Sequence, residues 1–379
     1  RRGFRECWRL AGACVPARCT GASARPSSRS GRPSVGAAGE SRSQPGAPQA
    51  AGPLDPGRGA PREPASMADS DEEEIDEEEL ERQQSLSNPE VVTKYKAASD
   101  IINKVIGALA EKVVPGADVL ALCQEGDAMI EAEAKGCFNK KNAKGEKVEK
   151  GIAFPTCVSV NTVVCHFSPC TGDAPVTLEE GDMVKIDMGV HIDGYIASVA
   201  HTIYLQGDMS APVEGVAADV MAAAQVAGEA AIRLIQPGKS SADVAPVLEQ
   251  VAETYGVNIV EGVLTHQLKR FVIDGNKVVL NKTTPELKAE ASTFEENEVY
   301  AIDIVMSSGE GKTKVVDEKE TNVYKRALDK EYNLKMKTSR AVFSEINKRF
   351  PTMPFTARSL EDVRGSKLGL VECLGHELL

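Results

Sequence analysis

The sequence is poor in aromatic residues, and no apolar run approaches the roughly 18 residues of a membrane span. Aromatic residues make up 4% of the chain, and Trp8 is the only tryptophan. The nine cysteines show no CxxC spacing, and no secretory signal precedes them. This excludes a disulfide scaffold and favours reduced thiols in a cytosolic or nuclear protein. We therefore expect a soluble protein without membrane insertion.

Lysine is absent from residues 1–66, which contain eleven arginines and four acids, a net charge of +7. The segment is rich in Ala, Gly, Pro and Ser and has no hydrophobic period, so we expect it to be disordered. A transit peptide would also be rich in Arg and Ser. However, the chain begins with Arg, and Met67 followed by Ala and Asp is typical of a cytosolic start. We therefore favour translated upstream sequence.

An acidic segment follows. Ten of the thirteen residues from 69 to 81 are Asp or Glu. A run of like charges repels itself and stays solvated, so we expect residues 67–88 to form a disordered arm. We favour a solubilising role for this arm over a role in attracting basic partners.

Helical and strand-like patterns alternate from residue 89 onward. Asn88 followed by Pro89 is typical of a helix start, and Asp118 of a second one. Helices and antiparallel hairpins in alternation predict one α+β domain over residues 89–379. The expected helices are 91–114, 119–135, 213–235, 242–255 and 338–350; the expected strands are 153–160, 162–167, 263–269, 299–306 and 321–324, with a short apolar element at 368–378.

The stretch VKIDMGVHIDGYIASVAHTIYL, residues 184–205, predicts a β-hairpin around HIDG. Asp187 lies on its first strand, and a carboxylate there could hold a hard metal ion. A four-residue loop would place Ser198 opposite Asp187, whereas a two-residue loop would place Ala200 there. Neither is a carboxylate, and a pair of metal ions needs several. The hairpin alone is therefore weak evidence for a metal site.

Five motifs carry a resemblance to one branch of the methionine aminopeptidase, or pita-bread, family. They are GIAFPT at 151–156, HFSP at 166–169, THQLK at 265–269, SSGEGK at 307–312 and LKMKTSRA at 334–341. Together they are typical of the proliferation-associated protein family, the non-peptidase branch of the type II methionine aminopeptidases. The similarity spans residues 91–379 and implies the pita-bread fold.

In the peptidases, as this resemblance implies, two Asp, one His and two Glu bind the metal ions. Asp187 and His266 match, Ser198 stands at the second Asp, and Asp303 replaces the first Glu with a shorter acid. The resemblance places the second Glu on a strand beyond Leu379. We therefore expect a degenerate pocket with no catalytic residue, metal or cofactor, and a C-terminally truncated domain with unpaired sheet edges and lowered stability.

His166 matches a histidine that positions substrate in the peptidases. Two enzymatic alternatives remain: a metal-dependent aminopeptidase with one weakly held ion, and a metal-free hydrolase similar to creatine amidinohydrolase. In the second, His166 and His266 would act as general acid and base. No arginine cluster or second base accompanies them in the sequence. Hydrogen-bonded buried histidines are the favoured interpretation, so we expect no enzyme.

Residues 323–350 are basic within an acidic chain, with eight Lys or Arg against three acids. Because basic side chains neutralise phosphates and aromatic rings stack on bases, the segment is the stronger candidate for binding RNA. The lysine-rich loop 139–151 is the second, and a merely solvated loop is an equal alternative there. The candidate residues are Lys325, Arg326, Lys330, Lys335, Lys337 and Arg340, with Lys140, Lys141 and Lys144 in the loop.

The resemblance also implies partners and location. It implies binding to RNA, to the large ribosomal subunit and to regulatory proteins, with a role in translation, ribosome biogenesis or growth. It further implies residence in the cytoplasm and the nucleus, including the nucleolus.

Overall fold

The computed structural model describes residue 82 and residues 84–141, 145–284, 290–315 and 322–379. The folded residues among them belong to one compact unit. The extension 1–66, the acidic residues 69–81 and Lys144 lie outside the described residues.

Two capped helices, α3 (Pro89–Ala110) and α4 (Val119–Lys135), begin the described fold. The Asn88 side chain accepts a hydrogen bond at 3.0 Å from the backbone N–H of Glu90, the second residue of α3. The Asp118 side chain accepts one at 2.8 Å from the third N–H of α4. Both helix starts agree with the sequence-based prediction. Leu86 packs beside the first turns of α3, so the packed chain begins inside the segment expected to be a solvated arm.

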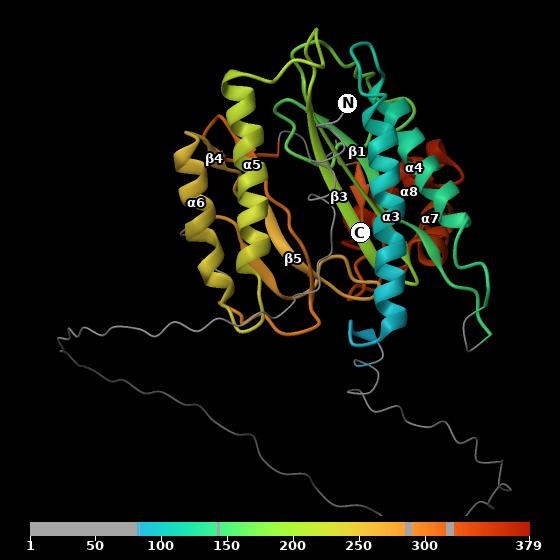
Figure 1. Ribbon diagram of the computed structural model, residues 1–379. Helices are drawn as coiled ribbons and strands as arrows, with labels where there is room; N and C mark the ends of the chain where they lie inside the picture. The colour runs from blue at the N-terminus through green and yellow to red at the C-terminus, as the bar shows by residue number, and fades with distance from the viewer. Residues whose placement is uncertain (1–81, 83, 142–144, 285–289, 316–321) are drawn as a thin grey trace, which may run out of the picture. The chain divides into compact units, whose positions relative to one another are not determined.

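A three-stranded antiparallel sheet lies against these helices (Figure 1). Helix α3 packs on β2 and β3, and α4 packs on β1. Their apolar faces form one hydrophobic core, in which Ile102, Ile106 and Ile186 are fully buried. The strands are β1 (Lys150–Val160), β2 (Met183–Ile192) and β3 (Tyr195–Tyr204).

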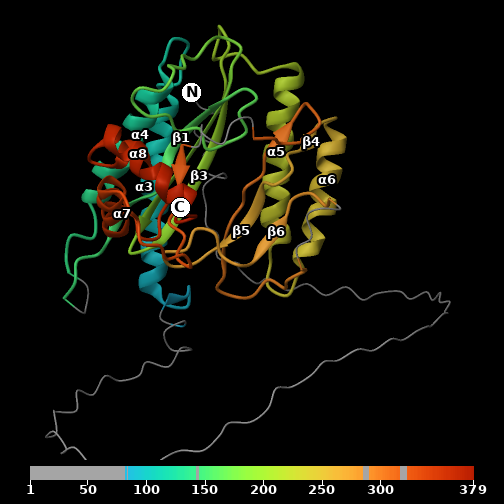
Figure 2. The same cartoon turned by 180° about the vertical axis from the view of Figure 1, so that it is seen from behind.

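Helices α5 (Gly215–Leu234) and α6 (Val244–Thr254) lie side by side over a second group of strands (Figures 1 and 2). Strand β5 is flanked by β6 and β7, and β4 pairs with β8. A second core lies between these helices and strands. The elements are η1 (Ser241–Asp243), β4 (Asn258–Ile259), β5 (Leu264–Leu268), β6 (Val278–Leu280), β7 (Val299–Ala301) and β8 (Met306–Ser307).

The last part of the chain contributes two helices packed on each other, α7 (Lys337–Arg349) and α8 (Val363–Gly375). Strands β9 and β10 pair, and β10 also contacts β1. This third group of elements therefore contacts the first sheet. The remaining elements are β9 (Val323–Tyr324), β10 (Phe355–Thr356) and η3 (Ala357–Ser359).

Three sequence-based boundaries are wrong. Residues 162–167 form no strand, because Asn161 has a φ of +51° and ends β1. The chain then turns back, and the Phe167 carbonyl accepts a hydrogen bond from the Val158 N–H at 2.8 Å. Residues 299–306 form parts of two short strands, and the terminal apolar element is part of the longer helix α8.

Helix α5 bears on the expectation that the chain has no membrane span. Its length and composition would allow it to cross a membrane, although the sequence pattern had suggested no such segment. A single helix of this kind is weak evidence, since helices of globular proteins meet the same criteria. Here Ala223, Ala227 and Ala231 of α5 are fully buried in the second core.

Candidate functional site

The β2–β3 hairpin closes with the two-residue loop Asp193-Gly194. Both residues have positive φ, 56° and 79°, as a type I′ turn requires. In this register Asp187 faces Ala200, so the four-residue alternative with Ser198 opposite Asp187 is wrong. Ser198 instead pairs with Gly189, two residues beyond Asp187 on β2. It therefore lies diagonally from Asp187 on the same sheet face. Ser198 is exposed.

His266 and Asp303 come from the second group of strands. His266 lies on β5, paired on both sides by β6 and β7. The backbone N–H of Asp303 donates to Thr265 Oγ1 at 3.2 Å, and its carbonyl accepts from Asn281 Nδ2 at 2.5 Å. Thr265 Oγ1 in turn donates to Asn281 Oδ1 at 3.1 Å. These bonds fix the backbone that carries the Asp303 carboxylate.

His166 is held beside Asp187. Its φ of +62° is left-handed, and its backbone forms a hydrogen bond with the Asp187 carboxylate. Its ring centroid lies 4.9 Å from that of Phe154. The charge of His266 helps to lower the pKa of His166, and the charge of Asp303 helps to raise the pKa of Asp187. The structure thus brings together His166, Asp187, His266 and Asp303, four of the five predicted pocket residues.

Burial controls the protonation of this cluster. It raises the pKa of Asp187 to about 7, a rise opposed by the His166 backbone and increased by Asp303. Burial also raises the pKa of Asp303, against the effect of His266. The pKa of His166 is lowered by burial and then by His266. Among the described residues, His266 Nδ1 is buried and makes no hydrogen bond. Burial therefore favours the neutral form of both carboxyl groups.

Sequence reasoning missed two residues of this pocket, Lys185 and Cys165. Lys185 precedes Asp187 by two positions on β2 and so shares its sheet face, and its Nζ donates to the Asn161 carbonyl at 2.8 Å. Burial lowers the pKa of Lys185 to about 8. Burial, followed by the charge of Asp187, raises the pKa of Cys165 to about 12. Strand alternation could have identified Lys185. The only sequence signal for Cys165 was its position next to His166.

The described residues do not fit a two-metal centre. Within them, no group of three or more His, Cys, Asp or Glu side chains is arranged to hold a metal ion. Ala200 faces Asp187, and Ser198 offers only an uncharged, exposed hydroxyl. Two divalent ions need several ionised carboxylates, whereas burial raises the pKa of Asp187 to about 7.

Four of the predicted RNA-binding residues are engaged by the fold itself. Lys325 and Lys330 each form an ion pair with an acidic residue, Asp274 in the case of Lys325. The Arg326 guanidinium lies 5.7 Å from the centroid of a phenylalanine ring. Arg340 donates to two backbone carbonyls at 3.1 and 2.7 Å. These side chains are partly committed to holding residues 325–340 in place.

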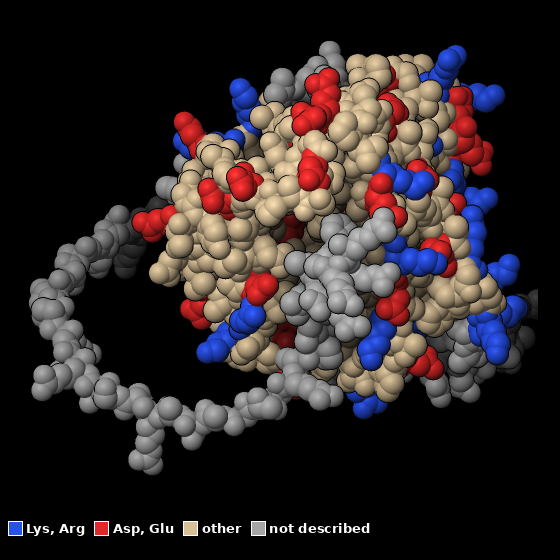
Figure 3. Space-filling view, turned by 45° about the horizontal axis from the view of Figure 1, so that its top comes forward, with Lys and Arg blue, Asp and Glu red and all other residues tan. Residues whose placement is uncertain are grey.

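The other candidates are more available. Lys335 and Lys337 are exposed and form no ion pair within the described part of the chain. Lys140 and Lys141 are also exposed, at the edge of the lysine-rich loop. Basic and acidic side chains are interspersed over the face drawn in Figure 3. On this face, any attraction for a polyanion is therefore local.

Comparison with known proteins gives the family. The sequence pattern of metallopeptidase family M24 matches residues 93–324. The chain belongs to this family. ERBB-3 binding protein 1 of Solanum tuberosum is 55% identical over 304 residues, which cover 80% of this chain and 76% of the relative. Proliferation-associated protein A of Dictyostelium discoideum is 49% identical, with coverage of 81% and 78%. The proliferation-associated branch expected from the sequence is confirmed.

Two further proteins are also similar to this chain. The protein named Curved DNA-binding protein of Schizosaccharomyces pombe is 42% identical, with coverage of 78% of this chain and 76% of the relative. The solved structure of a thermophilic Arx1 superposes with a TM-score of 0.67 at 31% identity and covers 76% of this chain and 82% of that one. The predicted α+β pita-bread fold is confirmed.

Proposed function

We propose that this M24 protein is not a peptidase but binds RNA and, through RNA, the large ribosomal subunit. Its role lies in translation, ribosome biogenesis or growth, in the cytoplasm and the nucleus, including the nucleolus, with regulatory proteins as further partners. A contrast between two parts of the fold carries the proposal. The pocket around Asp187 lacks a charge-balanced set of ligands, whereas Lys335 and Lys337 are exposed and unpaired among the described residues.

Charge supports a local contact. The chain carries a net charge of −12, so its overall field repels a polyanion. Binding must therefore rest on a few lysines that contact phosphates, and it must weaken steeply as salt rises. The name of the Schizosaccharomyces pombe relative also supports nucleic acid as a class of ligand.

Co-sedimentation of the full chain with purified large ribosomal subunits across a salt series tests this proposal. Each lysine–phosphate contact contributes about one unit of slope to a plot of log affinity against log salt. The Lys335→Gln, Lys337→Gln double variant is therefore expected to bind more weakly and with a shallower slope. Lys96→Gln, Lys239→Gln is the matched control, because both lysines are exposed and the change in net charge is the same. Equal loss in both double variants, or no binding at low salt, would refute the basic site.

The absence of peptidase activity needs its own test. We expect the purified protein to contain no stoichiometric divalent ion and to leave the N-terminal Met of a test peptide in place. Metal analysis by mass spectrometry and chromatography of the peptide measure these two quantities. A chain that holds metal and releases Met would be an aminopeptidase, contrary to the proposal.

A further inference from the structure

Residues 327–336 run antiparallel to the C-terminal end of α8. The Ala327 N–H donates to the Leu378 carbonyl at 2.9 Å. Lys330 Nζ lies 3.2 Å from a carboxylate oxygen of Glu377. On α8 itself, the Glu372 carboxylate accepts two backbone N–H groups of the segment, at 2.8 and 3.2 Å. These contacts fix the segment at both of its ends.

Two exposed aromatic rings stack between these anchor points. The ring centroids of Tyr332 and His376 lie 3.6 Å apart, with an interplanar angle of 17°. Tyr332 retains 36% of its exposure, and His376 is also exposed. Hydrogen bonds and an ion pair already hold the segment on α8, so the stack is not needed to attach it. Each ring shares one face with the other and has a second face of its own.

Charges of both signs lie beside this stack, since Asp329 and Glu331 are exposed in the same segment as the lysines. The Glu372 carboxylate is occupied by the backbone N–H groups of Lys335 and Met336, and Glu377 is paired with Lys330. The side chains of Lys335 and Lys337 remain exposed and form no ion pair among the described residues. An aromatic platform beside unpaired lysines suits a single strand, whose bases are free to stack while its phosphates meet the cations.

We infer that the Tyr332–His376 pair is a stacking platform for an unpaired base of single-stranded RNA, with Lys335 and Lys337 on the adjacent phosphates. This inference rests on the proposed RNA-binding function and specifies its ligand. A duplex keeps its bases stacked on one another, so it can use the lysines but not the rings.

Fluorescence anisotropy with the full chain tests the inference, using a labelled 12-nucleotide RNA and the duplex of the same sequence. Tyr332→Ala is expected to weaken binding of the single strand about fivefold or more, the lower end of base–aromatic stacking. Its binding of the duplex and its salt slope should stay unchanged. Tyr332→Phe should restore binding because the ring remains, and His376→Ala should reproduce the loss if the fold is intact by circular dichroism.

The outcomes separate this inference from the proposal on which it rests. If Lys335→Gln, Lys337→Gln weakens RNA binding while Tyr332→Ala does not, RNA binding stands and the platform is rejected. Equal losses for the single strand and the duplex in Tyr332→Ala would also reject it, as would tighter binding of duplex DNA than of the single-stranded RNA. If the wild-type chain binds neither RNA, the proposed function itself fails.

Discussion

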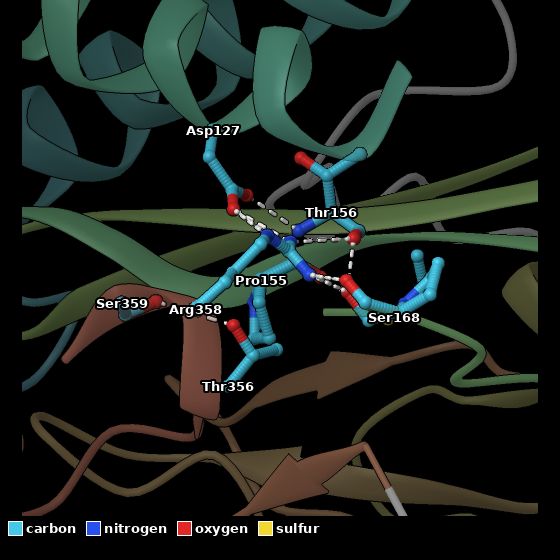
Figure 4. Close-up of polar contacts among 9 residues, drawn as sticks. Asp127, Pro155, Thr156, Ser168, Thr356, Arg358 and Ser359 are labelled. Carbon is cyan, nitrogen blue, oxygen red and sulfur yellow. Dashed lines mark hydrogen bonds and ion pairs between the residues drawn. The ribbon is translucent and has the colours of Figure 1, made fainter. Parts of the chain in front are cut away.

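The carboxylate of Asp127 and the guanidinium of Arg358, 231 positions apart in the sequence, form an ion pair with Nη2 and Oδ2 at 2.6 Å (Figure 4). Asp127 lies on α4 and Arg358 on η3, so the pair joins the first core to the C-terminal part of the fold. Arg358 also donates to the Thr156 carbonyl and to Ser168 Oγ, at 3.1 and 2.6 Å. The second Asp127 oxygen accepts the Thr156 N–H at 2.7 Å.

Arg358→Met is expected to lower the free energy of unfolding by about 3–5 kcal/mol, because it leaves Asp127 charged, enclosed and without its partner. The Arg358 side chain is 5% exposed, so solvent screens this pair little. Urea unfolding at pH 7 measures the change. The control is Lys135→Met, which breaks the exposed pair with Glu131 on α4 and should change stability by less than about 0.5 kcal/mol. Equal effects of the two changes would show that the Asp127–Arg358 pair is no more than a surface contact.

Much of the fold could be predicted from the sequence where local chemistry decides it. Asn88 and Asp118 marked helix starts because their side chains satisfy backbone N–H groups that no helical residue can reach. Residues 162–167 were mispredicted because their β-branched composition is typical of a strand, whereas the positive φ of Asn161 depends on the surrounding fold. The link from Asp127 to Arg358 carried no local signal at all.

The site was predictable in part and for a similar reason. Family motifs placed His166, Asp187, His266 and Asp303 together, and the structure does the same. The position of Ser198 depended on loop length, which composition alone left open, since HIDG accommodates both the two-residue and the four-residue turn. Lys185 was overlooked because the residues that the resemblance placed in the pocket include no lysine.

Helices α7 and α8 approach closely at Gly369. A Cβ placed on Gly369 would lie 2.8 Å from Val342 Cγ2, closer than real Cβ contacts allow. Gly369→Ala is therefore expected to destabilise the protein by about 1–3 kcal/mol, and the added change Val342→Ala should recover part of that loss. Thermal unfolding measures both. Gly228→Ala on α5 is the control, since nothing lies within 4 Å of the new methyl group, and a gain of about 0.5–1 kcal/mol is expected there. A loss at Gly228 as large as that at Gly369 would remove steric crowding as the cause.

His191 makes the fold sensitive to acid. Burial lowers the pKa of His191 to about 4, and its Nδ1 accepts the Gly194 N–H at 3.2 Å. The unfolded chain takes up this proton near pH 6.5, so the stability from neutral His191 is complete above that pH and is lost as pH falls toward 4. Between pH 7.5 and 5 the loss should be about 2 kcal/mol. His191→Gln removes this titrating group. The unfolding free energy of the wild type minus that of the variant should therefore fall by about 2 kcal/mol between pH 7.5 and pH 5. A difference independent of pH would mean that the pKa of His191 is the same in the folded and the unfolded chain.

Asp187 provides the sharpest test of a pocket without metal. Burial raises its pKa to about 7, so the folded chain holds this proton more tightly than the unfolded chain, whose value is near 3.9. The folded state is therefore penalised increasingly as pH rises from about 4 to 7, and fully above 7. Asp187→Asn mimics the neutral acid and is expected to stabilise the protein by about 4 kcal/mol at pH 8, an advantage that disappears near pH 4. Urea unfolding at a series of pH values measures this difference. Asp100→Asn, at an exposed position, is the control and should leave the unfolding free energy unchanged at every pH. A destabilised Asp187→Asn at pH 8, together with loss of a bound divalent ion, would show instead that the carboxylate binds a cation.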